Sequence, residues 1–289
     1  MGLQELPPHY TWTGARAAGM SPEEIGADGA RVTRGAYVSR ALPLTMREAC
    51  LTARAVLPPE AAFSHVTAAA LFDAPVPHTW PLALTVPPGI YRPRRQRLRV
   101  HVRDLVPGDV TVHRGVRVTS GPQTWLDLAG LLAPEELVAT GDSLFRHGHL
   151  DAESLQERFG RATGTRGIVV ARTLAPLLTP LAASRPESLM RYWLLDSGLP
   201  APQPQVPIFD RWRREVAHAD LGYSEWKVAI EYEGRQHAEL RQFGRDLERY
   251  PLMSSTGWLL LRFGGSHLSR RATIVDRVSG ALRSRGARW

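Results

Sequence analysis

The stretch HADLGYSEWKVAIEYEGRQH, residues 218–237, decides the fold class of the carboxyl-terminal part of this chain. Its alternation of apolar and polar residues predicts two antiparallel strands joined by a tight turn near Ser224. Three carboxylates interrupt the pattern, with Asp220 in the first strand and Glu231 and Glu233 in the second. Burying a carboxylate costs free energy unless a cation or hydrogen-bond donors compensate for it. The hairpin therefore raises the question of what its acids bind.

Strand parity indicates how these acids are arranged. It places Glu231 and Glu233 on one face of the second strand, and the apolar residues Trp226, Val228, Ile230 and Tyr232 on the other. Cross-strand neighbours have Cβ atoms ~5 Å apart, so the turn brings Asp220 close to Glu231. Carboxylates that converge repel each other unless a cation binds. Oxygen ligands of this kind suit Mg²⁺ or Mn²⁺, and we expect Asp220 and Glu231 to hold such an ion.

The residues around the hairpin predict an α/β domain over 180–289. A helix follows Ser184, which is a suitable N-cap, and it ends at Gly198. The remaining elements are a strand at 204–209, the hairpin, a helix at 239–253, a buried strand at 257–263 and a closing helix at 269–285. The order is thus α, three β, α, β, α.

The amino-terminal residues, 1–45, predict a different unit. A short helix stops at Gly19, and a second helix is capped by Ser21 with Glu24 at its third position. The alternating stretch RVTRGAYVSR at 31–40 then predicts a pair of strands. This order is typical of a winged helix-turn-helix, although a small helical cap has the same pattern. Residues 46–175 predict an α+β middle domain, including helices at 46–56 and 58–73.

The amino-acid composition limits the classes of function that the chain can have. The chain has 289 residues with 36 Lys and Arg against 28 Asp and Glu, a formal charge of +8. Such a balance favours a polyanionic partner such as DNA, although an arginine-rich chain from a GC-rich genome has the same charge. A basic run at 91–100 includes Arg94 and Arg95, which are either phosphate contacts or part of a solvated loop. The single cysteine, Cys50, and the lack of a signal peptide or long apolar run predict a cytoplasmic protein without a membrane segment.

The carboxyl-terminal motifs also resemble a known family. RPESLMRYWLLDSGLP, the hairpin stretch and QFGRDLERYPLMSSTGWLLLRF together resemble the PD-(D/E)XK nuclease superfamily, in particular the uncharacterised endonuclease-like domains related to very-short-patch repair endonucleases. The matching residues are Glu187, Asp220, Glu231, Glu233, Gly234, His237, Arg245, Asp246, Gly257, Trp258, Leu261 and Arg262. The resemblance implies a restriction-endonuclease-like fold and Mg²⁺- or Mn²⁺-dependent hydrolysis of DNA.

In this interpretation Asp220 and Glu231 hold the metal, Glu187 and Glu233 support it, and His237 contacts water or phosphate. Arg235 and Arg245 join Arg94 and Arg95 as candidate nucleic-acid contacts. The superfamily's usual lysine, two positions after the glutamate, is Glu233 here, and Lys227 lies ~13 Å away along the strand. His237 or Arg245 would then have to supply the missing cation.

Each of these residues also has a structural interpretation. Glu187 with Ser184 forms a capping-box pattern. Asp220 can cap a turn, Glu233 can be a solvated strand end, His237 can neighbour a helix N-cap, and Arg245 can pair along a helix surface. A non-catalytic DNA-binding regulator or antitoxin with a degenerate nuclease fold therefore remains the alternative.

The amino-terminal two thirds resemble the abortive-infection type IV antitoxin family in GARVTRGAYVSR, FSHVTAAALF and RVTSGPQTWLDLAGLL. This resemblance implies a winged helix and a DNA-binding regulator. Taken together, the two resemblances suggest a role in phage defence or DNA repair. They also suggest a toxin or another defence protein as a partner, and double-strand cutters are commonly homodimers.

Overall fold

The computed structural model describes residues 6–234 and 255–289. The helix expected at 239–253 lies outside the described residues, as do Arg235, His237 and Arg245. The chain forms two compact units. The first unit consists of residues 1–132 and 147–176, and the second of residues 133–146 and 177–289. The architecture of the described residues is mixed α/β, with three separate sheets.

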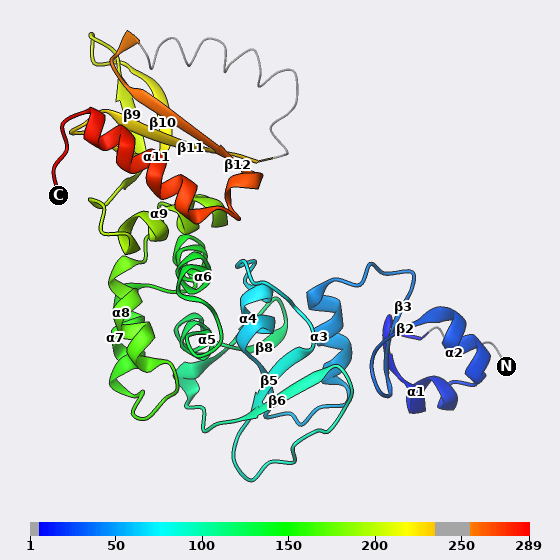
Figure 1. Cartoon of the computed structure of the whole chain (residues 1–289). Helices are drawn as coiled ribbons and strands as arrows, with labels where there is room; N and C mark the ends of the chain where they lie inside the picture. The colour runs from blue at the N-terminus through cyan, green and yellow to red at the C-terminus, as the bar shows by residue number, and fades with distance from the viewer. Residues whose placement is uncertain (1–5, 235–254) are drawn as a thin grey trace. The chain divides into compact units, whose positions relative to one another are not determined.

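The first unit begins with a small three-stranded sheet and two helices (Figure 1). These elements are β1 (His9–Thr11), α1 (Trp12–Ala17), α2 (Pro22–Asp28), β2 (Gly29–Thr33) and β3 (Ala36–Ser39), with strand order β1-β3-β2. The predicted capping box at Ser21 and Glu24 is present at the start of α2. Tyr10, Ala15 and Ile25 form a small core beneath the two helices.

The rest of the first unit is built on a five-stranded sheet of order β6-β5-β4-β8-β7, together with helices. Its strands are β4 (Ala62–Phe63), β5 (Leu82–Val86), β6 (Leu98–Val102), β7 (Val110–His113) and β8 (Val116–Thr119). The helices and 3-10 turns are α3 (Met46–Arg54), α4 (His65–Leu71), η1 (Pro107–Asp109), α5 (Gly121–Leu128), α7 (Ala152–Gly160), α8 (Ile168–Leu174) and η2 (Ala175–Leu177). The prediction of one helix over 58–73 is wrong, because β4 pairs with β5 and β8 and α4 begins only at His65.

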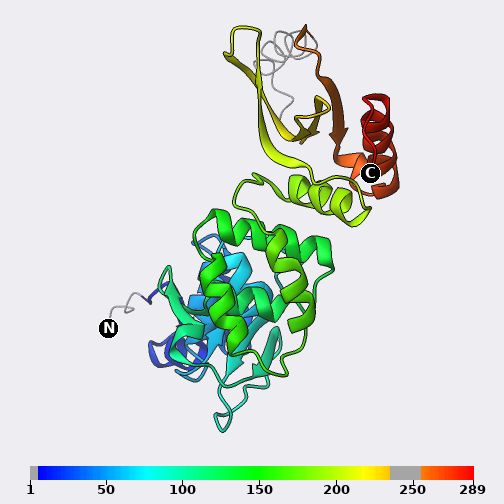
Figure 2. The same ribbon diagram turned by 90° about the vertical axis from the view of Figure 1, so that its left-hand side faces the viewer.

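The second unit is built on a four-stranded sheet of order β12-β11-β10-β9. The strands are β9 (Gln203–Phe209), β10 (Glu215–Tyr223), β11 (Val228–Glu233) and β12 (Leu259–Gly264). The other elements are α6 (Pro134–Arg146), α9 (Arg185–Asp196), η4 (Gly265–His267) and α11 (Arg271–Ser284). Strands β9, β10 and β11 are antiparallel neighbours, whereas β12 runs parallel to β11. Figures 1 and 2 show α11 beside β12, and α9 contacts both α11 and β10.

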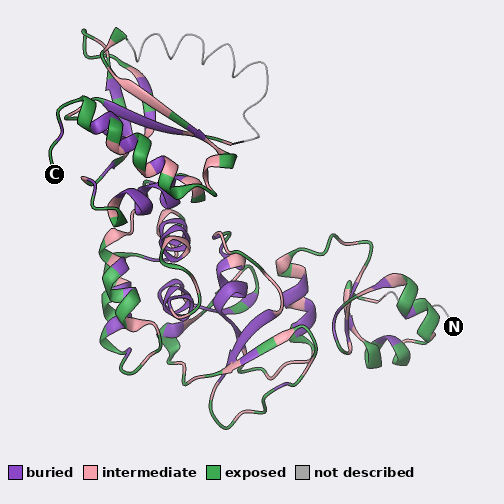
Figure 3. Cartoon of the chain, in the orientation of Figure 1, coloured by how far each residue is buried: buried purple, intermediate pink, exposed green. Residues whose placement is uncertain are grey.

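The central strands of the four-stranded sheet are more deeply buried than its edge strand β12. Figure 3 shows β10 and β11 as largely buried, and Leu221, Val228 and Ile230 are fully enclosed. Trp226 and Lys227 lie in the four-residue turn, so the prediction that the second strand begins before Val228 is wrong. Strand β12 is mostly half-buried and not buried as predicted, with only Phe263 enclosed.

Helix α6 falls in the range predicted for the middle domain, yet it packs against α9 of the second unit. Asp142 on α6 is fully buried and accepts hydrogen bonds from Nη2 of Arg191 on α9, at 2.8 and 3.1 Å. A buried charge is tolerated only when it is paired, so this ion pair fixes the position of α6 on α9. Among the described helices, none is long and apolar enough to cross a membrane.

Candidate functional site

The acids of the hairpin lie where regular strand pairing ends. The last ladder pair between β10 and β11 is Leu221 with Ile230, so Asp220 and Glu231 occupy the next opposed positions. Asp220 uses its side chain there, since its Oδ2 accepts a 2.8 Å hydrogen bond from the amide of Tyr232. A side chain has thus replaced a backbone acceptor. The structure therefore agrees with the prediction that the turn brings Asp220 alongside the part of the second strand that carries Glu231.

On its other side, Asp220 lies opposite an irregular point in β9. The ladder pairs Ala219 with Val206 and Leu221 with Pro204, which leaves Gln205 opposite Asp220 without a ladder partner. Gln205 has a φ of 52°, in the left-handed region that residues other than glycine seldom adopt. Its Nε2 donates a 3.0 Å hydrogen bond to Oε2 of Glu187. Sequence reasoning missed Gln205, because strand periodicity carries no signal for a left-handed residue.

Glu187 combines the two roles that the sequence left open. Ser184 is the N-cap of α9 and its hydroxyl donates to Oε1 of Glu187 at 2.7 Å. Oε2 accepts from the amide of Ala183 at 2.8 Å as well as from Gln205. This differs from a standard capping box, in which the glutamate would bond the amide of Ser184 itself. Glu187 therefore caps the helix and at the same time faces the strand that carries Asp220.

The electrostatics of Glu187 reflect that position. Burial raises the pKa of the Glu187 carboxyl, and the negative charge of Asp220 raises it further. The hydrogen bonds from Ser184, Ala183 and Gln205 act in the opposite direction. Each of these three donors is neutral, so the hydrogen bonds stabilise the carboxylate without adding a positive charge. Glu187 thus lies close enough to Asp220 for their charges to interact, and Asp220 is opposed to Glu231; these three acids are called here the carboxylate cluster.

Glu231 is the most enclosed hairpin acid, with 6% of its surface exposed. Its neighbour on β12 is Arg262, whose guanidinium forms an ion pair with Glu233. Both partners of that pair are partly exposed. Lys227 is turned away from the acids, since its Nζ donates to the carbonyl of Thr256 at 3.1 Å. The structure therefore places an arginine, and not Lys227, beside the hairpin acids.

The carboxylates of Asp220 and Glu231 suit a metal ion only if other ligands complete its coordination. Within residues 6–234 and 255–289 there is no group of three or more His, Cys, Asp or Glu side chains that could hold a metal ion unaided. Asp220 and Glu231 supply two opposed carboxylates. Mg²⁺ is commonly held by one or two carboxylates, with water and substrate phosphate completing its octahedron. The residues thus fit an ion that shares its coordination with a phosphate, and they do not form a preformed protein cage.

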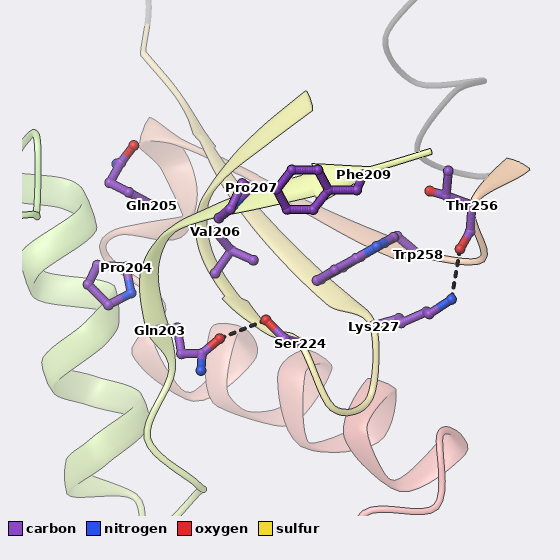
Figure 4. A pocket seen from close by; sticks show the side chains of 10 residues that line it. All are labelled: Gln203, Pro204, Gln205, Val206, Pro207, Phe209, Ser224, Lys227, Thr256 and Trp258. Atoms are coloured by element: carbon purple, nitrogen blue, oxygen red, sulfur yellow. Dashed lines mark hydrogen bonds between the residues drawn. The ribbon is translucent and has the colours of Figure 1, made fainter. Parts of the chain in front are cut away.

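An open hollow of about 490 Å³ lies on the second unit between β9 and the β10–β11 turn. Figure 4 shows Lys227 reaching Thr256 and Ser224 bonded to Gln203 along its wall. Its floor includes Phe209 and Trp258. Among the described residues that line the hollow there is no acid, so it is separate from the carboxylate cluster except at Gln205.

A basic groove is present on the first unit. Arg31, Arg34 and Arg95 line it together with Trp12 and Tyr37. Nη1 of Arg95 donates to the carbonyl of Arg34 at 2.6 Å, which ties the basic run to the β2–β3 hairpin. Arg94 is exposed and does not line the groove. The candidate contact Arg95 is thus part of a mixed cationic and aromatic surface, a combination that suits nucleic acid.

These observations define the class: a mixed α/β protein with a carboxylate cluster on one unit and a basic groove on the other. No family model matches the chain. It is similar to two proteins of Mycobacterium tuberculosis, the uncharacterized protein Rv2248 of strain H37Rv and the uncharacterized protein MT2308 of strain CDC 1551. Each is 29% identical over 196 residues, which cover 68% of this chain and 71% of the relative.

Proposed function

We propose that this chain is a DNA-binding endonuclease that hydrolyses DNA phosphodiester bonds with the help of Mg²⁺ or Mn²⁺. The observation that carries the proposal is the carboxylate cluster, in which Asp220 lies opposite Glu231 and its charge raises the pKa of buried Glu187. The order of α9, β9, β10, β11, β12 and α11 supports a restriction-endonuclease-like domain.

Each acid has a separate task in this proposal. Asp220 and Glu231 would hold the cation, which supplies Lewis-acid activation of the phosphate and of the attacking water. Glu187 holds Gln205 in place opposite Asp220 through the 3.0 Å hydrogen bond. Arg262, next to Glu231 on the neighbouring strand, supplies positive charge near the scissile phosphate in place of the usual lysine. Glu233 restrains Arg262 through their ion pair.

The first unit would supply DNA affinity. Two helices joined by a tight turn and followed by the β2–β3 hairpin, in a sheet of order β1-β3-β2, support a winged helix. Arg31, Arg34 and Arg95 would contact phosphates, which makes affinity fall steeply as the salt concentration rises. Trp12, which is partly exposed, is available for stacking on a base or sugar.

A plasmid cleavage assay tests the proposal. Supercoiled plasmid is incubated with Mg²⁺ or Mn²⁺ and with wild type, Asp220→Asn, Glu231→Gln or the control Glu215→Gln. Glu215 lies on the same strand as Asp220 but is exposed and paired with His218, so its variant keeps activity. We expect the two cluster variants to lose at least ~100-fold in rate. Equal nicking by all four proteins, or no nicking with either metal, would contradict the nuclease proposal.

The alternative is a non-catalytic DNA-binding regulator that keeps a degenerate nuclease fold. Two contacts favour it: Lys227 is engaged by Thr256, and Arg262 is engaged by Glu233. In that case a toxin or another defence protein would be the partner, and the acids would only stabilise the fold. Salt-dependent DNA binding without cleavage would support this alternative.

A further inference from the structure

The first unit contains a cavity of about 180 Å³ that none of the functions above uses. It lies beside the five-stranded sheet, at the start of α4. Its lining consists of His65, Val66, Pro77, His78, Pro81, Ala83, Arg99, His101, Leu131 and Leu132. For comparison, an engineered apolar cavity of ~150 Å³ binds benzene. The cavity therefore has room for a compact ligand of roughly that size.

His65 occupies an unusual position in this cavity. It is the first residue of α4, is only 7% exposed, and has a φ of 52°. A left-handed conformation costs a residue with a Cβ roughly 1–3 kcal/mol and persists where its surroundings hold it. Here Nδ1 lies 2.9 Å from the hydroxyl of Ser64, which also accepts a hydrogen bond from Thr85. The ring is thus fixed in orientation by a buried polar network.

A second histidine stacks on the first. The rings of His65 and His101 lie 3.7 Å apart at an interplanar angle of 17°. Behind them Asp127 is buried, with Oδ2 at 3.6 Å from Nδ1 of His65 and Oδ1 at 3.1 Å from Arg103. Burial lowers the pKa of His65 to about 3 and also lowers that of His101, and neighbouring arginines add to both effects. Both shifts favour the neutral imidazole.

Among the described residues that line the cavity there is no acid, while Arg99 lies on its wall. Arg103 lies near the histidines, where it is paired with Asp127. Nε2 of His101 is buried and has no hydrogen-bond partner among the described residues. A buried polar atom without a partner costs about 1–3 kcal/mol, which an acceptor that reaches this nitrogen would recover. The remaining walls, chiefly Val66, Leu131 and Leu132, are apolar.

We propose that this cavity is a binding site for a small carboxylic acid with a compact apolar or aromatic body. The carboxylate would accept a hydrogen bond from His101 and face Arg99, while the body would pack against Leu131, Leu132 and Val66. His101 and Arg99 form the anion-binding subsite, since Arg103 is already paired with Asp127. This site lies within the first unit and does not depend on the carboxylate cluster or on nuclease activity.

Calorimetric titration of the full chain with benzoate and with benzamide tests the proposal. The two probes have the same body, but only benzoate is charged. We expect saturable one-to-one binding of benzoate, with benzamide at least about tenfold weaker. Binding of benzamide as tightly as benzoate, or no saturable binding at millimolar benzoate, would overturn the proposal.

Two variants and one control variant locate the site. Arg99→Gln changes an exposed side chain at the cavity wall and is expected to weaken benzoate binding about tenfold. Arg117→Gln removes an exposed arginine of the same unit that does not line the cavity, and its affinity stays at the wild-type value. His101→Phe keeps a stacked ring but removes Nε2, and it also weakens binding. Unchanged affinity in both Arg99→Gln and His101→Phe would place the benzoate elsewhere and contradict the assignment.

Discussion

Asp142 and Glu187 are both buried acids of the second unit, yet their surroundings differ. Asp142 is compensated by a full positive charge, the guanidinium of Arg191. Among the described residues, Glu187 accepts hydrogen bonds from the neutral donors Ser184, Ala183 and Gln205, and it lies close enough to Asp220 for that charge to raise its pKa. Burial is the main cause of a raised pKa at both. The difference separates an acid that joins two helices from an acid that lies close to another carboxylate.

The largest expected effect comes from removing Arg191, the cation of the buried Asp142–Arg191 ion pair. Arg191→Met leaves Asp142 buried without its partner, which costs about 3–5 kcal/mol of unfolding free energy. Urea denaturation measures this loss. The double variant Arg191→Met, Asp142→Leu removes both charges and should recover most of the stability. A single variant as stable as wild type would show that the pair does not fix α6 on α9.

A medium effect is expected in the pH dependence of stability. The folded-state pKa of Glu187 lies above its unfolded value. The folded protein therefore binds more protons than the unfolded protein at pH values between these two pKa values. The contribution of Glu187 is therefore fully present below the unfolded pKa and is lost as pH rises through the folded pKa. Glu187→Gln should flatten the decline in unfolding free energy above pH 4.5, the ordinary value for glutamate. An identical pH profile in the variant would show that Glu187 is not under electrostatic strain.

The smallest effect is expected at Glu233, an exposed acid beside the carboxylate cluster. Glu233→Gln removes the ion pair with Arg262, whose side chains are both more than 40% exposed. Surface pairs contribute about 0–1 kcal/mol, so thermal unfolding should shift little. In the nuclease proposal the freed Arg262 keeps its place beside Glu231, and cleavage should fall less than in Glu231→Gln. A loss of stability as large as that of Arg191→Met would place Glu233 with the structural acids.

The sequence predicted the parts of this site that depend on short-range pattern. Alternation and a tight turn near Ser224 were enough to place Asp220 opposite Glu231, and the cap at Ser184 followed from local helix signals. Other contacts depend on long-range packing. The pair of Asp142 and Arg191 joins residues 49 positions apart.

Two conformational features were also beyond pattern reasoning. The left-handed conformations of Gln205 and His65 break periodicity without any residue type, such as glycine, to signal them. For the same reason the helix predicted over 58–73 hid the strand β4 and the histidine site at its end.

Asp220 and Glu231 are proposed to form a binding site for a divalent cation. Titration of the full chain with Mn²⁺, followed by the electron paramagnetic resonance signal of the free ion, tests it most directly. In the presence of DNA that cannot be cleaved, wild type should bind Mn²⁺, and Asp220→Asn and Glu231→Gln should not bind it. Glu215→Gln should bind as wild type does. Equal Mn²⁺ binding by wild type and both cluster variants would contradict the account.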